Sequence, residues 1–283
     1  MPKVGIIGGS GLYQIDALKD IKEITVETPF GEPSDNFIIG NLYGVEVVFL
    51  ARHKRGHTIL PTELNYRANI YAMKKLGVEQ LLSISAVGSF KKELKPLDIV
   101  LPDQFVDRTN QARKTTFFGQ GIVVHISFAD PVCGHLRKII YDTGKKSGIT
   151  MRDKGIYLNM EGPAFSTRAE SHLYKSWGMD IIGMTNMPEA RLAREAEMCF
   201  ATIALVTDYD CWYEEEVNIE MVMGNLLKNV ETAKKLIKEI VPQLKGERKC
   251  ACRDALKYAI VTDKKLIPEP IKEKLDIIIG KYM

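Results

Sequence analysis

The sequence predicts an α/β fold: a single domain with a central mixed, largely parallel sheet flanked by helices. Short apolar runs rich in Val and Ile alternate along the chain with segments of helical periodicity. This alternation is typical of β-α-β units. The expected strands are residues 4–7, 45–50, 80–85, 98–101, 156–160, 181–184 and 201–206.

The expected helices lie between these runs. Apolar residues from 64 to 76 fall on one face of a helix that ends at Gly77. Apolar residues from 219 to 240 repeat every three to four positions and predict a longer helix. Pro188 suits the first turn of a third. Residues 1–245 form the predicted domain, and residues 246–283, which begin polar and contain Pro268 and Pro270, form a helical appendage packed on it.

Composition excludes several classes of function. The formal net charge of +3 is too small to indicate a nucleic-acid surface, because Lys and Glu are mixed along the chain. No run approaches the roughly 18 apolar residues that a membrane span needs. The N-terminus enters an apolar run directly and lacks the pattern of a secretory signal, so we expect a cytoplasmic protein without membrane contacts.

A glycine-rich segment, residues 5–11, follows the first strand. Its glycines allow backbone amides to approach an anion, and Ser10 adds a hydroxyl. The segment lacks the third glycine of a dinucleotide-binding fingerprint and the Gly-Lys-Ser/Thr of a P-loop. It also lacks the last glycine of a nucleophile elbow. A tight turn without a ligand remains the alternative.

Two further strand ends carry anion-binding side chains. Arg52 offers a rigid fork of donors beside His53, although surface charges without a role remain an alternative. His53 and His57 have no third ligand nearby in sequence, so no zinc site is predicted. Another strand is expected to end at Ser85, and residues 86–89 after it offer a cradle of backbone amides for an anion. Together, Ser10, Arg52, His53 and Ser85 describe a pocket for a free phosphate at the ligand-binding edge of the sheet.

Other residues suit a planar base and its sugar. Phe165 lies in a Gly/Pro-rich loop and is either a stacking or a core aromatic. Thr185, before a helix, either binds an anion or caps the helix. Asp208 and Asp210 follow an apolar strand, where two carboxylates can ligate a cation, act as acid and base, bind a purine edge, or form a charged loop.

Taken together, these segments resemble the 5′-methylthioadenosine phosphorylase branch of the trimeric purine nucleoside phosphorylases. The resemblance extends to about residue 240, with the same order and spacing of several strings. These are 8–11 (Gly-Gly-Ser-Gly), 28–35, 51–53 with 57–58, 65–69, 161–163 with 165–170, 184–185 with 188–189, and 207–212.

The resemblance implies specific roles. The phosphate site would comprise Ser10, Arg52, His53, Ser85, the Ala86 amide and Thr185. Met184 would lie against the ribose, Phe165 would face the base, and Ser166 and Ile219 would shape specificity. Asp208, supported by Asp210, would protonate N7 of adenine and accept from its amino group.

The implied reaction is phosphorolysis of 5′-methylthioadenosine, with inorganic phosphate as co-substrate and neither metal nor organic cofactor. A broad purine nucleoside phosphorylase acting on adenosine, inosine and guanosine is the alternative within this class. A non-catalytic nucleoside-binding protein is the alternative outside it. The resemblance also implies a homotrimer or dimer of trimers, in which a neighbouring subunit completes the 5′ pocket. Residues 130–133 are one candidate for that contribution.

The five cysteines leave at least one thiol without an intrachain partner. Cys250-Ala251-Cys252 has the wrong spacing for a C-x-x-C redox or zinc site. Some thermophilic members of the resembled family carry a Cys-x-Cys near the C-terminus and disulfides elsewhere. The resemblance therefore implies a Cys133–Cys199 bridge and one involving Cys250 or Cys252, whereas reduced thiols are the cytosolic default.

Overall fold

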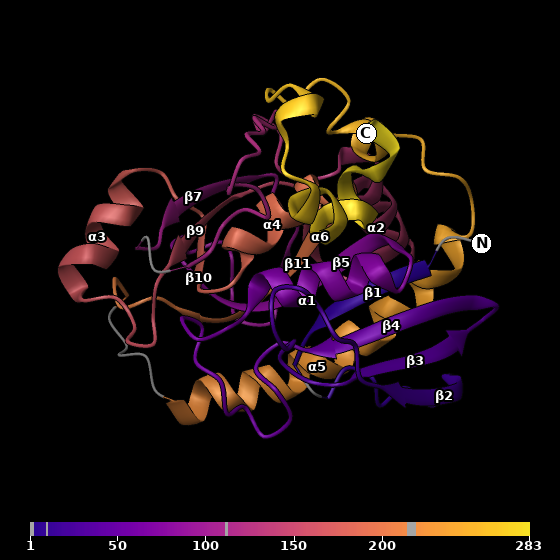
Figure 1. Ribbon diagram of the computed structural model, residues 1–283. Coiled ribbons are helices and arrows are strands. Elements are labelled where there is room, and N and C mark those ends of the chain that lie inside the picture. Colours follow the sequence, from indigo (N-terminus) through magenta and orange to yellow (C-terminus); the bar gives the residue numbers. More distant parts are fainter. Residues whose placement is uncertain (1–2, 10, 111–112, 214–218) are drawn as a thin grey trace.

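The computed structural model describes residues 3–9, 11–110, 113–213 and 219–283. Their centre is an 11-stranded sheet with helices on both faces (Figure 1). The strands are β1 Lys3–Gly8, β2 Lys19–Ile24, β3 Phe37–Leu42, β4 Val45–Ala51, β5 Val78–Ser89, β6 Ile99–Val100, β7 Gln104–Arg108, β8 Met151–Arg152, β9 Ile156–Met160, β10 Ile181–Gly183 and β11 Cys199–Tyr209. The α-helices are α1 Tyr66–Lys75, α2 Gly134–Lys146, α3 Arg168–Ser176, α4 Asn186–Glu195, α5 Ile219–Ile240 and α6 Glu269–Ile279.

The pairing of the strands confirms the predicted mixed, largely parallel sheet. The main path runs β2-β3-β4-β1-β5-β10-β9-β7, and β11 pairs with β5 outside this path. Six of the ten strand pairs among the described residues are parallel. β10 and β5 are antiparallel, so these two neighbouring strands run in opposite directions.

One predicted boundary is wrong in a way that matters for the site. We expected a strand to end at Ser85, but β5 continues to Ser89. The continuation is held by β11, which pairs with β5 in parallel as far as Tyr209 opposite Ser89. Ser85 and Ala86 therefore lie inside a strand and not in a loop after it.

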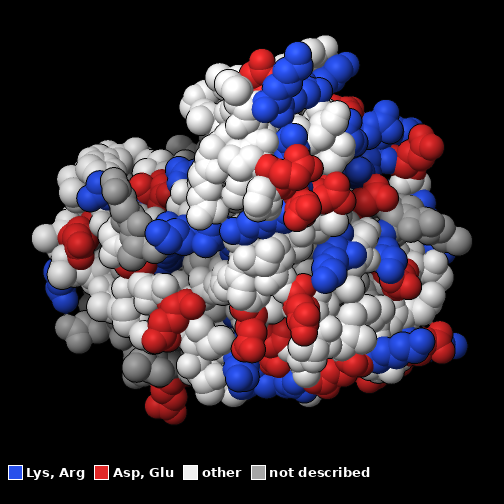
Figure 2. Space-filling view, in the orientation of Figure 1, with Lys and Arg blue, Asp and Glu red and all other residues white. Residues whose placement is uncertain are grey.

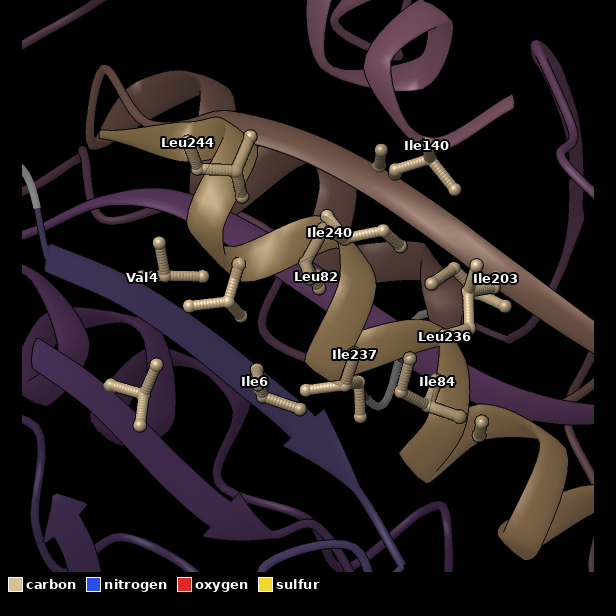
Figure 3. Close-up of a cluster of buried hydrophobic side chains, with 14 of the residues drawn as sticks. Val4, Ile6, Leu82, Ile84, Ile140, Ile203, Leu236, Ile237, Ile240 and Leu244 are labelled. Atoms are coloured by element: carbon tan, nitrogen blue, oxygen red, sulfur yellow. The ribbon is translucent and has the colours of Figure 1, made fainter. Parts of the chain in front are cut away.

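The two faces of the sheet bury separate cores. Val4 and Ile6 of β1 pack with Ile237 of α5 and Ile140 of α2 on one face (Figure 3). Ile7 packs on the other face, in the cluster that includes residues of α1, α4 and α6. The alternation along β1 places successive side chains on opposite faces. Because both faces are covered, the central strands are apolar runs.

The C-terminal segment contributes to the second core. Leu256, Ile267, Leu275 and Ile278 lie in the same cluster as α1 residues. In Figure 1 this yellow segment lies against the upper part of the molecule. Burial of its side chains explains why a segment that begins polar in sequence nevertheless packs on the domain. The boundary at residue 245 stays a prediction.

Several elements were not predicted because their sequences lack the expected pattern. Strand β2 has the sequence Lys-Asp-Ile-Lys-Glu-Ile and is almost wholly exposed at the edge of the sheet, where charged side chains oppose further strand pairing. β8 is only two residues long.

Acidic and basic side chains are mixed over the face of the molecule shown in Figure 2. No helix among the described residues has the length and apolar character to cross a bilayer.

Helix α5 tests this description of the core. Ile237 is fully buried against the sheet, whereas Glu239 of the same helix is exposed. We expect Ile237→Ala to lower the free energy of unfolding by about 2–5 kcal/mol, since it removes packed methyl groups and leaves a cavity. The matched control Glu239→Ala should change it by less than about 0.5 kcal/mol. Urea unfolding measures both, and equal effects would contradict the assignment of the buried face.

Candidate active site

The site begins at a break in the ladder of β5. β1 pairs with this edge of β5 up to Ser83, and β10 pairs with the same edge at Gly88 and Ser89. Residues 84–87 thus have no strand partner on that edge among the described residues. Ala86 is exposed here although its neighbours Ser85 and Val87 are buried. Backbone donors of a central strand are therefore open to a ligand between the ends of β1 and β10.

Arg52 lies at the end of this gap where β1 stops pairing with β5, beside Ser83 and Ile84. It directly follows β4, and its side chain is almost completely buried. Its Nε donates to Glu189 Oε1 at 2.6 Å, and its Nη2 donates to Glu189 Oε2 at 3.1 Å. Nη2 also donates to Ser83 Oγ at 2.7 Å. The guanidinium is thus held by a buried carboxylate, and the Coulombic attraction of Glu189 raises the pKa of Arg52 against the opposing effect of desolvation.

Two carbonyl oxygens of the diverging strands complete the Arg52 contacts. Nη1 donates to Ile84 O at 2.8 Å, and Nη2 approaches Ile7 O at 3.4 Å. One hydrogen of Nη1 is left without an acceptor among the described residues. The predicted phosphate contact therefore rests on a single N–H, and most of the guanidinium instead holds β1, β4, β5 and α4 together.

His53 is adjacent and has a defined tautomer. Its Nδ1 lies 2.8 Å from Ile59 O, and a carbonyl only accepts, so the proton is on Nδ1. The ring stacks on His57 with centroids 4.5 Å apart. Desolvation, followed by the charge of Arg52, lowers the pKa of His53 to about 4. The ring is neutral at pH 7, and Nε2 is an acceptor.

Tyr157, which was not predicted, lies between Ser85 of β5 and the end of β10. Its Oη lies 3.1 Å from Ser85 Oγ and is fully buried. A Cβ on Gly183 would lie 1.9 Å from that Oη, so only glycine fits at the end of β10. Thr185 follows, is buried, and forms no side-chain cap with α4, although it stands at the N-cap. Its hydroxyl is not used for capping, which favours the anion-binding alternative.

Arg113, also unpredicted, holds the loops around the site. Its Nε donates to Glu161 Oε1 at 2.9 Å, and its Nη1 donates to Met184 O at 2.6 Å and Met187 O at 3.1 Å. The side chain is buried. Arg113 lies in a segment without periodicity, so its sequence gave no signal that it fixes the segment carrying Met184 and Thr185.

Of the predicted carboxylates, Asp208 lies near the end of β11, on the opposite edge of β5, and Asp210 directly follows this strand. The register between β11 and β5 shifts between Val206 and Asp208, so that Asp208 lies opposite Gly88. Such a bulge changes the direction of a side chain. Thr207 Oγ donates to Asp208 Oδ2 at 2.7 Å. Burial raises the pKa of Asp208 to about 6, opposed by this hydrogen bond and assisted by the charge of Asp210.

Asp210 is also buried, and desolvation raises its pKa against the opposing effects of the Ser171 hydroxyl and the Cys211 amide. Its Oδ2 has no hydrogen-bond partner among the described residues. A buried carboxylate oxygen without a partner costs free energy, and a ligand donor would satisfy it. The pair Asp208–Asp210 thus supplies both an acid of raised pKa and an open acceptor.

The loop between β9 and α3 borders these carboxylates. Ser166 is buried, and its carbonyl accepts from the Cys211 thiol at 3.1 Å. Phe165 is 53% exposed, which excludes the alternative of a core aromatic. Met184 packs against Gly162, where a Cβ would lie 2.5 Å from its sulfur. Ser166 therefore lies beside the segment that follows Asp210, and Met184 lies against the loop that carries Phe165 and Ser166.

Two predicted residues lie wholly or partly outside the described part of the chain. Ser10 lies outside the described residues, and so does the side chain of Ile219, whose backbone begins α5. The spacing along β5 gives the distance between the two groups of site residues. Ser85 and Gly88 are three residues apart on β5, which corresponds to about 10 Å along a strand. The anion donors and the carboxylates are thus separated by roughly the length of a small polar molecule.

Comparisons with known proteins identify the family of the chain. The family model described as the phosphorylase superfamily matches residues 3–242. An S-methyl-5′-thioadenosine phosphorylase of Geobacter sulfurreducens is 56% identical over 282 residues, covering 99% of each chain. A Koribacter versatilis protein of the same name is 54% identical and covers 99% of this chain and 96% of its own.

Solved structures give the same result. A methylthioadenosine phosphorylase from an antarctic soil metagenomic library has a TM-score of 0.94 and 47% identity, covering 98% of each chain. A methylthioadenosine phosphorylase from Schistosoma mansoni, solved in complex with adenine, has a TM-score of 0.85 and 36% identity, covering 92% of this chain and 99% of its own. The α/β fold and the resemblance stated from the sequence are confirmed.

The Arg52–Glu189 pair generates a stability prediction. Glu189→Gln would leave the Arg52 charge buried without a counter-charge, so we expect a loss of about 3–5 kcal/mol in the free energy of unfolding. Glu239→Gln, an exposed position on α5, is the matched control and should have little effect. A loss below about 1 kcal/mol for Glu189→Gln in urea unfolding at neutral pH would show that Arg52 does not depend on this carboxylate.

Asp208 generates a pH-dependent prediction. Its pKa is 3.8 as an isolated group and about 6 in the fold, so the folded state binds the additional proton between these values. Its contribution to stability is therefore most favourable below about pH 4 and is lost as pH rises through about 6. The loss amounts to about 3 kcal/mol, at 1.36 kcal/mol per pKa unit.

Asp208→Asn does not titrate and should remove this loss. We expect the variant to be about 3 kcal/mol more stable than the wild type near pH 8 and equal to it near pH 4. Denaturant unfolding at several pH values measures the difference. Because all other titrating groups are shared, a difference independent of pH would show that Asp208 is ionised normally in the fold.

Proposed function

The chain belongs to the phosphorylase superfamily, and we propose that it cleaves S-methyl-5′-thioadenosine with phosphate to give adenine and 5-methylthioribose 1-phosphate. It is an enzyme of the pentosyltransferase class, as the sequence predicted. The observation that carries the reaction is the buried Asp208 carboxyl, with a pKa of about 6, opposite a gap in β5 bordered by anion donors.

We propose that phosphate binds in this gap. The Ala86 amide, the Ser85 and Thr185 hydroxyls and the remaining Arg52 N–H are the donors, and Ser10, outside the described residues, is expected to join them. Neutral His53 has the opposite role, because its Nε2 accepts. It would take the hydrogen bond of the protonated oxygen of hydrogen phosphate, so that unprotonated oxygens face the sugar. A preorganised set of this kind stabilises the charge that develops in the transition state.

Asp208 would then act on the leaving group. Phosphate attacks C1′ while the C–N bond lengthens, and adenine leaves readily only when N7 is protonated. Thr207 donates to Oδ2 of Asp208, so the acidic proton belongs on Oδ1. Oδ1 lies beside Gly88, where even a Cβ would come within 3.0 Å, so glycine keeps this side of the carboxyl open. A pKa near 6 keeps part of the population protonated near neutral pH.

The same carboxylates explain the preference for adenine. After proton transfer Asp208 accepts from the 6-amino group, and the open Asp210 Oδ2 is a second acceptor. A 6-oxopurine presents an acceptor at that position and would leave acceptor facing acceptor. Phe165 would contact the base, Met184 the ribose, and Ser166 and Ile219 the rim of the pocket. The adenine complex of a relative supports a base site in this fold.

We further propose a homo-oligomer, a trimer or dimer of trimers, in the cytoplasm, without organic cofactor. The first half of α5 exposes Met223 and Leu227, which are four residues apart on one helix face, and an exposed apolar pair of this kind favours a protein contact. Of residues 130–133, Val132 and Cys133 are buried within their own chain. Within that segment, Asp130 is therefore the residue that we expect to contact the pocket of a neighbouring subunit.

The test measures adenine release from methylthioadenosine by the purified protein, with and without phosphate and with inosine in parallel. We expect release to require phosphate and to be much slower with inosine. Asp208→Asn should lower kcat/KM for methylthioadenosine by about 10²–10⁴-fold, since it cannot donate the proton. Glu239→Gln should act like the wild type.

Each other outcome has a defined meaning. Equal turnover of inosine would assign a broad purine nucleoside phosphorylase. Release without phosphate would assign a hydrolase, and binding without release would assign a nucleoside-binding protein. Full activity of Asp208→Asn would exclude Asp208 as the proton donor.

A further inference from the structure

Four of the five cysteines, from three segments that are distant in sequence, lie close together in the fold. Cys133 is the N-cap of α2, Cys199 begins β11, and Cys250 and Cys252 flank one residue of the C-terminal segment. Their sulfur atoms all lie within 4.8 Å of one another, and three of the four residues are buried. No S–S bond joins them.

The arrangement fits a tetrahedral thiolate site. At a Zn–S distance of about 2.3 Å, the sulfurs of a tetrahedral site are about 3.8 Å apart. The Cys199 and Cys250 sulfurs are 3.2 Å apart, and the other sulfurs lie within the 4.8 Å limit. Small side-chain shifts would centre an ion among all four. Four cysteine ligands from three segments are a common composition for a structural zinc site.

The surroundings supply the supporting contacts that such sites use. The Leu136 amide in the first turn of α2 donates to Cys133 Sγ at 3.5 Å, and a helix N-terminus favours a sulfur that carries negative charge. A cavity of about 420 Å³ adjoins Cys133, Cys250 and Cys252 and is also lined by Arg194 and His125. Asp130 and Asp254 line the same cavity, which offers a route for an ion to the cluster.

We propose that Cys133, Cys199, Cys250 and Cys252 bind one zinc ion, which fastens the C-terminal segment to the start of β11 and to α2. Binding converts four thiols to thiolates and releases four protons, with no change of oxidation state. The ion and four thiolates together carry a charge of −2. Two disulfides from the same residues would release four electrons as well and would need an oxidant.

The sequence alone predicted no metal, because Cys250-Ala251-Cys252 has the wrong spacing for a C-x-x-C site. The fold supplies the missing ligands from residues 117 and 51 positions away from Cys250. The disulfides implied by the resemblance use the same four sulfurs and are the competing prediction. Zinc content and thiol count separate the two directly.

The experiment uses the full chain without a histidine tag, purified without chelator or reductant. We expect about one zinc per chain by elemental analysis, and five reactive thiols after denaturation with chelator. Cobalt substitution should give the intense visible bands of a tetrahedral thiolate complex. Cys250→Ser and Cys252→Ser should lose most of the zinc, whereas Cys211→Ser, outside the cluster, should retain it.

Treating the wild type with a strong chelator should lower its melting temperature and expose the C-terminal segment to protease, which tests the site even where a variant fails to fold. Absence of zinc together with a single reactive thiol would show two disulfides and overturn the proposal. Absence of zinc with five reactive thiols would show free cysteines and overturn it as well. Zinc retained by both Cys250→Ser and Cys252→Ser would place the ion elsewhere.

Discussion

The buried ion pair of Arg52 and Glu189 is the interaction on which the rest of the site depends. β1 leaves the edge of β5 after Ser83, so carbonyls near the divergence lose their ladder partners. The guanidinium supplies the missing donors to Ile84 O and Ile7 O, and Glu189 supplies its counter-charge. A gap in a central strand is tolerable only when its backbone groups are satisfied in this way. Ala86 can remain without a strand partner on this edge of β5 because Arg52 binds the carbonyl oxygens next to it.

The two buried carboxyl groups on the other side of the site lower the stability of the fold. Burial raises the pKa of both Asp208 and Asp210, and Asp210 Oδ2 lacks a partner. A structure selected for stability alone would place polar partners or apolar side chains here. Destabilising arrangements of this kind are typical of functional sites, and the proposed roles of Asp208 as a proton donor and Asp210 as an acceptor would account for this one.

Both sides are fixed by residues that do no chemistry. Tyr157 spans from Ser85 toward the end of β10, which is why Gly183 has no room for a side chain. Arg113 ties Glu161 to the segment of Met184. The cysteine cluster contacts the start of β11 through Cys199, and the same strand carries Asp208 near its other end. The positions of the reacting groups thus depend on contacts between segments that are distant in the chain.

The sequence by itself determined the α/β class, the long helix α5 and most central strands, because buried strands and amphipathic helices leave periodic apolar patterns. It also predicted that anion donors and two carboxylates share one site, since these residue types follow apolar strands in local strings. The tertiary structure decided the rest. The continuation of β5 past Ser85 depends on β11, the partners of Arg52 come from four elements, and the cysteine cluster joins three segments. Such contacts are set by packing across the sheet, and no local pattern of residues encodes them.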